Sequence, residues 1–458
     1  MLSYGGPRQP EDVLPFMRNA TAGRGVPDSR LLEVSGHYQG FGGASPINAR
    51  NAELRDALQA RLAERGSRLK VVVGNRNWHP FVSQALRELA DAGARHVLAL
   101  PTAAFGSYSG CRQYREDLAG AVALLAAGAD GATGDGFEAD AAARVGGDGG
   151  GPVDLTVDKT RPYYNTPGLL EANVDAIVEA YGRLAEQGVA AADARLVLVT
   201  HSIPLGMETG SAPSPDSDGA HGVADVDYPT ETGQPGRHSA HHPGGRSATL
   251  TPAQPAEQRE PGVTADLSTE ISYVTQHEAL AAILVPEVAR RLGLAQVEAD
   301  LVYCSRSGPP QARWLEPDVN DHLEALAAGR LTDGSPVDRP GGVVAAPFGF
   351  ISDHMEVVFD LDTEAAQTAH DLGMPYARAA TVGTHPAFVD SLVDILIERA
   401  AAARGEDVHP GSTTGVGPFH TVCPPSCCRP GTRHPGTRPA DGAAHEPAAG
   451  HQPAMSGS

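Results

Sequence analysis

Residues 195–204 read RLVLVTHSIP, and this segment decides the fold. The Leu-Val-Leu-Val run at 196–199 has no polar interruption, which is typical of a strand buried on both faces. Just before it, residues 170–181 carry apolar side chains at the spacing of one helix face. An amphipathic helix that leads into a continuous apolar strand predicts one unit of a parallel sheet covered by helices.

The same alternation of helix and strand runs twice, before and after about residue 165. We therefore expect an α/β fold of two similar, Rossmann-like, doubly wound parallel-sheet halves, residues 1–165 and 166–403, with a cleft between them. The predicted strands span residues 69–74, 96–100, 195–200, 300–304 and 343–347, and the predicted helices include residues 54–62, 81–89, 170–181, 271–292 and 388–403.

The charge balance limits the partners of this chain. Its 458 residues contain 35 Lys+Arg against 56 Asp+Glu, a net charge of −21, which repels a phosphate backbone. We expect no nucleic-acid partner. The longest uncharged apolar stretch, residues 119–129, is shorter than the ~20 residues that span a bilayer, and no signal segment opens the chain. We expect a cytoplasmic protein without a membrane span.

Three segments are poor in large apolar side chains and rich in small and polar residues. They bury too little apolar surface to offset the entropy of ordering. Residues 131–151 are expected to be a low-complexity loop, residues 208–268 a disordered insertion, and residues 404–458 a flexible tail.

Polar residues follow the predicted strands, where ligands bind in open parallel sheets. No G-x-G-x-x-G or G-x-x-x-x-G-K-[ST] motif occurs there, so no nucleotide is expected. Tyr4 precedes Gly-Gly-Pro, His201 ends the strand at 195–200, and Ser45 lies in a glycine-rich loop just after Tyr38. An ordinary turn, a core histidine and a helix-capping serine are the alternatives.

Residues 350–364 follow another strand and contain a row of carboxylates. Glu356, Asp360 and Glu364 are spaced four residues apart, which places them on one face of an α-helix. A solvated acidic face is the common explanation of such a row. Its position at a strand end instead indicates a path for a divalent cation or for protons, and carboxylates beside an imidazole suit a first-row metal.

The five cysteines are distributed unevenly. Cys423, Cys427 and Cys428 lie within six positions and suit soft-metal ligation with a fourth ligand from elsewhere, for which Cys111 is the best candidate. Cys304 lies inside a predicted strand and is assigned to the core. The alternative is a tail whose thiols have no partner.

Taken in order, the motifs YGGP, GGASPIN, SYSGCRQY, HSIP and GFISDHMEVVFDLD resemble the ferrochelatase family, most closely its actinobacterial branch that metallates coproporphyrin III. The resemblance implies a chelatase fold whose halves enclose a porphyrin. It implies Fe(2+) insertion into coproporphyrin III to give Fe-coproporphyrin III (coproheme) in heme b biosynthesis, with release of two pyrrole protons and without a nucleotide.

The resemblance also assigns roles to individual residues. His201 matches the residue that ligates iron or accepts a pyrrole proton, and Glu356 matches its carboxylate partner. Asp360 and Glu364 match an acidic row that delivers metal or removes protons. The residues expected to contact the porphyrin are Tyr4 as an axial ligand, Tyr38, Ser45, Tyr114 and Arg24.

Several family members hold a [2Fe–2S] cluster through cysteines, and Cys111, Cys423, Cys427 and Cys428 match that arrangement. The expected partners are coproporphyrin III and Fe(2+), and the expected oligomeric state is a monomer. Such a monomer is compatible with transient contact with neighbouring enzymes of heme biosynthesis. The alternatives are a protoporphyrin IX ferrochelatase, a chelatase that inserts cobalt or nickel, and a non-catalytic porphyrin or iron carrier.

Overall fold

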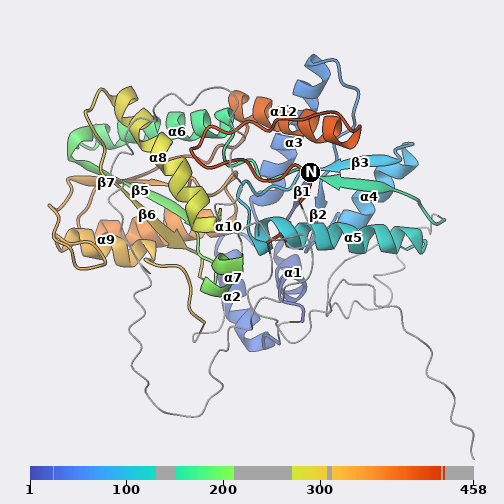
Figure 1. Ribbon diagram of the computed structural model, residues 1–458. Helices are drawn as coiled ribbons and strands as arrows, with labels where there is room; N and C mark the ends of the chain where they lie inside the picture. Colours follow the sequence, from blue (N-terminus) through green and yellow to red (C-terminus); the bar gives the residue numbers. More distant parts are fainter. Residues whose placement is uncertain (24, 130–150, 211–270, 307–311, 424–426, 429–458) are drawn as a thin grey trace, which may run out of the picture.

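The computed structural model describes residues 1–23, 25–129, 151–210, 271–306, 312–423 and 427–428. Figure 1 shows helices packed on both sides of parallel strands in this part of the chain. None of the helices in these ranges combines the length and the apolar character that a membrane crossing requires.

A four-stranded parallel sheet forms the second half of the molecule. Its order is β6 (Ala299–Cys304), β5 (Ala194–His201), β7 (Gly342–Ala346) and β8 (Tyr376–Arg378). All residues of β5 except the last are buried, as are all residues of β6 and β7. Continuous burial explains why apolar residues make up most of these strands, and the two charged residues among them, Arg195 and Asp300, form a buried ion pair.

The two faces of this sheet are covered by different helices. Leu196 and Leu198 join the core cluster that contains α6 (Pro167–Glu186) and α8 (Tyr273–Leu292). The valines between and after them in β5 point the opposite way and pack with α9 (Val319–Ala327). Alternation along one strand therefore builds two cores, as a doubly wound sheet requires.

The first half repeats this arrangement with shorter strands. β1 (Leu2–Ser3) pairs in parallel with β2 (Gly74–Asn75), and β3 (His96–Ala99) pairs in parallel with β4 (Thr156–Lys159). An amide of β1 donates a hydrogen bond to the carbonyl of Leu100, just past β3, at 2.8 Å. This contact joins the two ladders in the order β2-β1-β3-β4.

Each half thus has the strand order 2-1-3-4 when its strands are numbered within that half. The prediction of an α/β fold with two similar parallel-sheet halves is confirmed. The helices of the first half are α1 (Val13–Ala20), α2 (Asp28–Gly40), α3 (Ile47–Glu64), α4 (Val82–Asp91) and α5 (Gln113–Ala126).

The last long helix, α12 (Pro386–Ala403), holds the halves together because it packs on both α6 and α3 (Figure 1). Its approach to α6 is close enough that a Cβ at Gly168 would lie 1.8 Å from the carbonyl oxygen of Ala387. On the side of α3, Arg65 donates to the carboxylate of Asp394 at 2.7 Å. The C-terminal helix therefore belongs to both halves.

One strand prediction needs correction, and two strands were missed. Of the strand predicted over residues 69–74, only the end pairs, as β2. The side-chain amide of Gln59 hydrogen-bonds the carbonyl of Leu69 at 2.7 Å and the amide of Val71 at 2.8 Å, so these backbone groups are satisfied without a neighbouring strand. The short strands β4 and β8 were not predicted, because neither is a continuous apolar run.

The expected flexible segments are also smaller than predicted. Part of residues 404–423 packs on the body, since Phe419 is 1% exposed and the Thr413 amide donates to the Asn165 carbonyl at 3.0 Å. The average composition of a segment does not reveal that one aromatic side chain in it is buried. Glu208 belongs to α7 (Leu205–Gly210), and its carboxylate accepts a hydrogen bond from the Val274 amide at 3.2 Å. The remaining predictions for residues 131–150, 211–268 and 429–458 lie outside the described residues.

Candidate active site at the strand ends

His201 is the last residue of β5, the strand that lies between two others in its sheet. Its Nδ1 lies 2.5 Å from the carbonyl oxygen of Ser202, and because a carbonyl can only accept, Nδ1 carries the proton. In the neutral imidazole the lone pair is therefore on Nε2, which lies 3.6 Å from a carboxylate oxygen of Glu356. This nitrogen can accept a proton or bind a metal.

Glu356 reaches this point from α10 (Met355–Val357), which begins soon after β7. Its carboxylate also lies 3.7 Å from Nδ1 of His354, so it is bracketed by two imidazoles, and its side chain is 47% exposed. In the part of the chain that the structure describes, no group of three or more His, Cys, Asp or Glu side chains is already placed to hold a metal ion.

The acidic row has a different backbone from the predicted one. Residues 358–365 form a π-helix, η4 (Val358–Ala365), whose turns are wider than those of the expected α-helix. The three carboxylates lie close together in space. The proximity of Glu356 and Glu364 raises the pKa of Asp360.

Asp360 has an unusual environment for a carboxylate. Burial and, to a smaller extent, the neighbouring carboxylates together raise its pKa to about 7, whereas the hydrogen bond from the Ser305 hydroxyl opposes the rise. Ser305 adopts a φ of 62°, which is uncommon outside glycine, and follows the end of β6 directly. A carboxyl group that exchanges its proton near neutral pH therefore lies beside the His201–Glu356 pair.

The first half of the chain contributes aromatic side chains to the same region. Tyr4, just past β1, and Tyr38, in α2, pack edge-on against Phe16 with ring centroids 6.1 and 6.0 Å apart. Burial raises the pKa of Tyr38, and the charges of Glu356 and Tyr4 add to this effect. Tyr38 is thus close to the carboxylate of the other half, and the site is built from both sheets.

α2 also touches the helix of the acidic row directly. The ring of His37 stacks on Phe359 with centroids 4.2 Å apart and an angle of 12° between the planes. The pKa of Glu364 is raised by partial burial, while His37 opposes that rise. The segment that holds Asp360 and Glu364 therefore lies against the first half.

The other predicted porphyrin contacts are placed unequally. Ser45 is buried beside the Tyr-Gly-Gly-Pro turn, and a Cβ at Gly6 would lie 2.5 Å from its Cβ, so glycine is required there. Tyr114 is also buried, beneath the guanidinium of Arg76, which is 5.3 Å from the ring centroid. Arg24 lies outside the described residues.

Three residues of this region carried no prediction of their own. Arg76 lies just past β2 and forms an ion pair with Asp117 at 2.5 Å, and it could have been found by the same rule of strand ends. His354 lies two residues before Glu356 and contacts it. Ser305 contacts Asp360 from a segment 55 residues away in the sequence, which no local pattern reveals.

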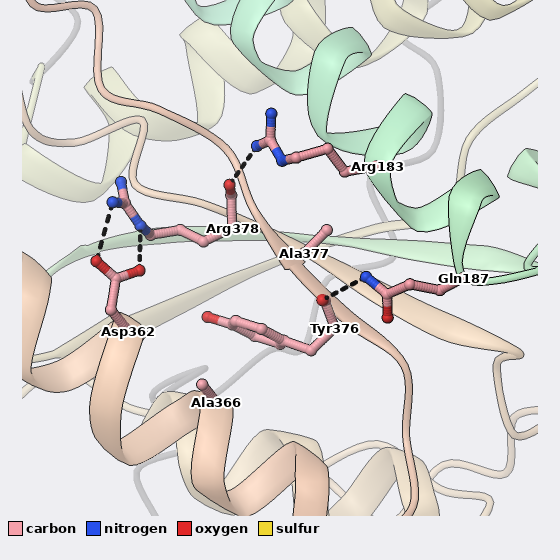
Figure 2. A pocket seen from close by; sticks show the side chains of 7 residues that line it. All are labelled: Arg183, Gln187, Asp362, Ala366, Tyr376, Ala377 and Arg378. Atoms are coloured by element: carbon pink, nitrogen blue, oxygen red, sulfur yellow. Dashed lines mark hydrogen bonds and ion pairs between the residues drawn. The ribbon is translucent and has the colours of Figure 1, made fainter.

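A surface hollow of about 330 Å³ lies on the outer side of β8, and Figure 2 shows its lining residues. Arg183 donates to the carbonyl of Arg378 at 2.6 Å, and Gln187 donates to the carbonyl of Tyr376 at 3.1 Å, so the edge of the sheet is covered by side chains. Arg378 in turn holds Asp362, in the acidic helix. The residues that line the hollow thus hold the helix that carries Asp360 against β8.

The four predicted cysteine ligands converge at a second place. Cys111, in the short helix η2 (Tyr108–Arg112), meets the three C-terminal cysteines in one small pocket. Thiols of Cys423 and Cys428 hydrogen-bond Cys111 and hold its pKa below the usual value, although burial opposes this. The sulfurs of Cys427 and Cys428 are 3.6 Å apart. Cys304 is buried in β6, away from this pocket, as predicted.

Two parallel-sheet halves that join a histidine and a row of carboxylates define an α/β protein able to handle a metal cation and protons at one site. The model of the family described as "Ferrochelatase" matches residues 1–400. The chain belongs to the ferrochelatase family.

Its relatives cover almost the whole chain. A protein of Streptomyces coelicolor named "Coproporphyrin III ferrochelatase" is 39% identical over 96% of this chain and 95% of its own length. Proteins of the same name from Streptomyces griseus and Frankia alni are 39% and 36% identical, over 93% and 95% of this chain and 92% and 87% of their own lengths.

Proposed function

We propose that this chain inserts Fe(2+) into coproporphyrin III to give Fe-coproporphyrin III, as a lyase of heme b biosynthesis. Family membership supports metal insertion, and the names of the relatives support this tetrapyrrole. The observation that carries the proposal is the meeting of His201 Nε2 with the Glu356 carboxylate at 3.6 Å, beside Tyr38 of the other half.

The reaction exchanges one Fe(2+) for two pyrrole protons, so the site must accept protons as the metal enters. In the proposed mechanism, Nε2 of His201 accepts a proton because its lone pair is unshared, and the anion of Glu356 stabilises the imidazolium that forms. Asp360 and Glu364 then guide Fe(2+) toward the pair or carry protons away from it. A carboxyl whose pKa is about 7 suits proton exchange near neutral pH.

The tetrapyrrole would lie between the two halves. Tyr4, whose side chain is exposed, is proposed as the axial ligand, with Tyr38 and Ser45 in contact with the ring and its carboxylates. Because Tyr114 is buried, it would act through Arg76 above it. Holding the ring in one orientation lowers the barrier to insertion by proximity.

The test is anaerobic Fe(2+) insertion, followed by the absorbance change of the porphyrin, with coproporphyrin III and protoporphyrin IX side by side. His201→Ala should abolish insertion but leave porphyrin binding, and Glu356→Gln should slow it strongly. His370→Ala, which removes an exposed imidazole from the neighbouring helix, is the matched control and should keep full activity.

Each outcome discriminates between hypotheses. Faster turnover of protoporphyrin IX would replace the proposed substrate but keep the activity. Preference for Co(2+) or Ni(2+) would replace the metal. Binding of both porphyrins without insertion by the parent protein would indicate a carrier, and parental rates in His201→Ala would remove its assigned role.

We further propose that Cys111, Cys423, Cys427 and Cys428 hold a [2Fe–2S] cluster. Each iron of such a cluster takes two cysteine ligands, and the four thiols line one pocket. When bound, the cluster supplies a one-electron redox centre. Equimolar iron and sulfide in the purified protein, lost in Cys111→Ala, would support it, and a parent without sulfide would refute it.

The proposal extends to the whole molecule. We propose that residues 1–165 and 166–403 act as two halves of a cytoplasmic monomer that contacts neighbouring enzymes of heme biosynthesis transiently. Light scattering during gel filtration tests the monomer, since a mass of twice 47.5 kDa would contradict it.

A further inference from the structure

The pocket of the four cysteines has an unusual wall. The other residues that line it are all cationic, namely Arg112, Arg115 and Lys159, and no carboxylate is among the lining residues. In a chain with a net charge of −21, this concentration of positive charge is a local property of the fold. It suits a strongly negative group.

Lys159 makes the closest of these contacts. It is the last residue of β4, and its Nζ lies 3.1 Å from the sulfur of Cys111. A second hydrogen bond, to the carbonyl of Thr160 at 2.8 Å, fixes the position of the ammonium group. By contrast, Arg112 and Arg115 reach backbone carbonyls of the cysteines, at 3.4 and 3.5 Å.

The choice of lysine at this position is informative. The whole chain contains 33 arginines and only two lysines, Lys70 and Lys159. Lysine is a compact point charge with three donors, whereas the planar guanidinium spreads its charge over five donors. A chain that uses arginine almost everywhere has a lysine at the position whose side-chain nitrogen contacts the sulfur of Cys111.

We propose that Lys159 is a positioning residue that donates a hydrogen bond to the coordinating sulfur of Cys111 and raises the reduction potential of the cluster. This inference rests on the proposed [2Fe–2S] cluster. The physical reason is charge. Four thiolates and two sulfides outweigh two Fe(3+) by two negative charges, and reduction adds a third. A fixed cation and a hydrogen bond at the ligand stabilise the more negative state.

The experiment is a redox titration of the full-length protein in its cluster-loaded form, with dithionite as the electron donor. One electron from dithionite reduces one Fe(3+) of the cluster to Fe(2+), and electron paramagnetic resonance follows the reduced form. Lys159→Met removes the charge at similar length, and Lys159→Arg keeps the charge. Lys70→Met is the matched control, because Lys70 is half-exposed and pairs with Glu88 at 2.6 Å.

We expect Lys159→Met to disfavour reduction at least tenfold, which is 59 mV toward negative potential for a one-electron couple. Lys159→Arg should restore most of this shift, and Lys70→Met should keep the parental potential. If Lys159→Met cannot hold the cluster, retention at the parental potential in Lys159→Arg supports the role of the charge.

Two results would overturn the inference. An unchanged potential in Lys159→Met, or an equal shift in Lys70→Met, would show that Lys159 does not act on the cluster while leaving the cluster itself intact. A parent protein without iron and sulfide would overturn the cluster, and the role of Lys159 with it. The amounts of iron and sulfide in the parent therefore separate the two failures.

Discussion

Replacing Asp360 with asparagine tests whether the Asp360 carboxyl group lowers the free energy of unfolding at neutral pH. Burial raises the pKa of Asp360 from 3.8 to about 7. Between these values the unfolded chain has lost the proton and the folded chain has kept it. The folded state then binds more protons, so its stability falls as pH rises through this window and stays low above pH 7.

The magnitude follows from the pKa. One pKa unit corresponds to about 1.4 kcal/mol, so the parent should lose about 3 kcal/mol of unfolding free energy between pH 5 and pH 8 through this group. Asparagine does not titrate, and its side-chain oxygen still accepts from the Ser305 hydroxyl. Asp360→Asn should therefore gain about 3 kcal/mol relative to the parent from pH 5 to pH 8.

The assay is denaturant unfolding of parent and variant at pH 5 and pH 8, with a chelator present to remove bound metal. Asp371→Asn is the control, because hydrogen bonds from His370 and Gln367 lower the pKa of Asp371 and its removal should bring no gain at higher pH. A constant difference between Asp360→Asn and the parent at both pH values would refute the reasoning. Under the proposed function, the more stable variant should also insert Fe(2+) more slowly.

Three further predictions concern packing and the cysteines. Phe419→Ala should lower the free energy of unfolding by about 3–5 kcal/mol, measured by thermal unfolding, and an unchanged transition would mean that residues 404–423 do not pack. Gly168→Ala should cost about 1–3 kcal/mol in the same assay, since its Cβ meets the carbonyl of Ala387, and parental stability would contradict this contact. Cys304→Ala should keep the iron and sulfide content that Cys111→Ala loses. Loss of iron and sulfide from Cys304→Ala would contradict the proposed set of cluster ligands.

Much of the fold could be predicted because its information is local. The strands β5, β6 and β7 are buried on both faces, so each contains an apolar run between amphipathic helices. The strands that were missed or misjudged are short or lie at an edge. There the backbone is satisfied by side chains, such as that of Gln59, and local pattern says little.

The site was predicted in outline for a related reason. A parallel sheet gathers the carboxyl ends of its strands at one edge, so His201 and the segment of Glu356 could be expected to meet. The environment of each group could not be predicted. Glu356 is half-exposed and Asp360 is less exposed, although both belong to one regularly spaced row. Burial depends on what packs above a residue, which includes α2 from the other half.

By itself, the sequence determined the α/β class, the repeated alternation of helix and strand in its halves, the motifs of the ferrochelatase family and the five cysteines. Periodicity and motifs are written along the chain, and burial of one helix face or strand needs no distant partner to be recognised. Only the tertiary structure decided which groups touch. Lys159 meets Cys111, Ser305 meets Asp360, and residues 404–423 return to the body. These contacts join segments far apart in sequence, and their energies depend on the shared burial that folding alone creates.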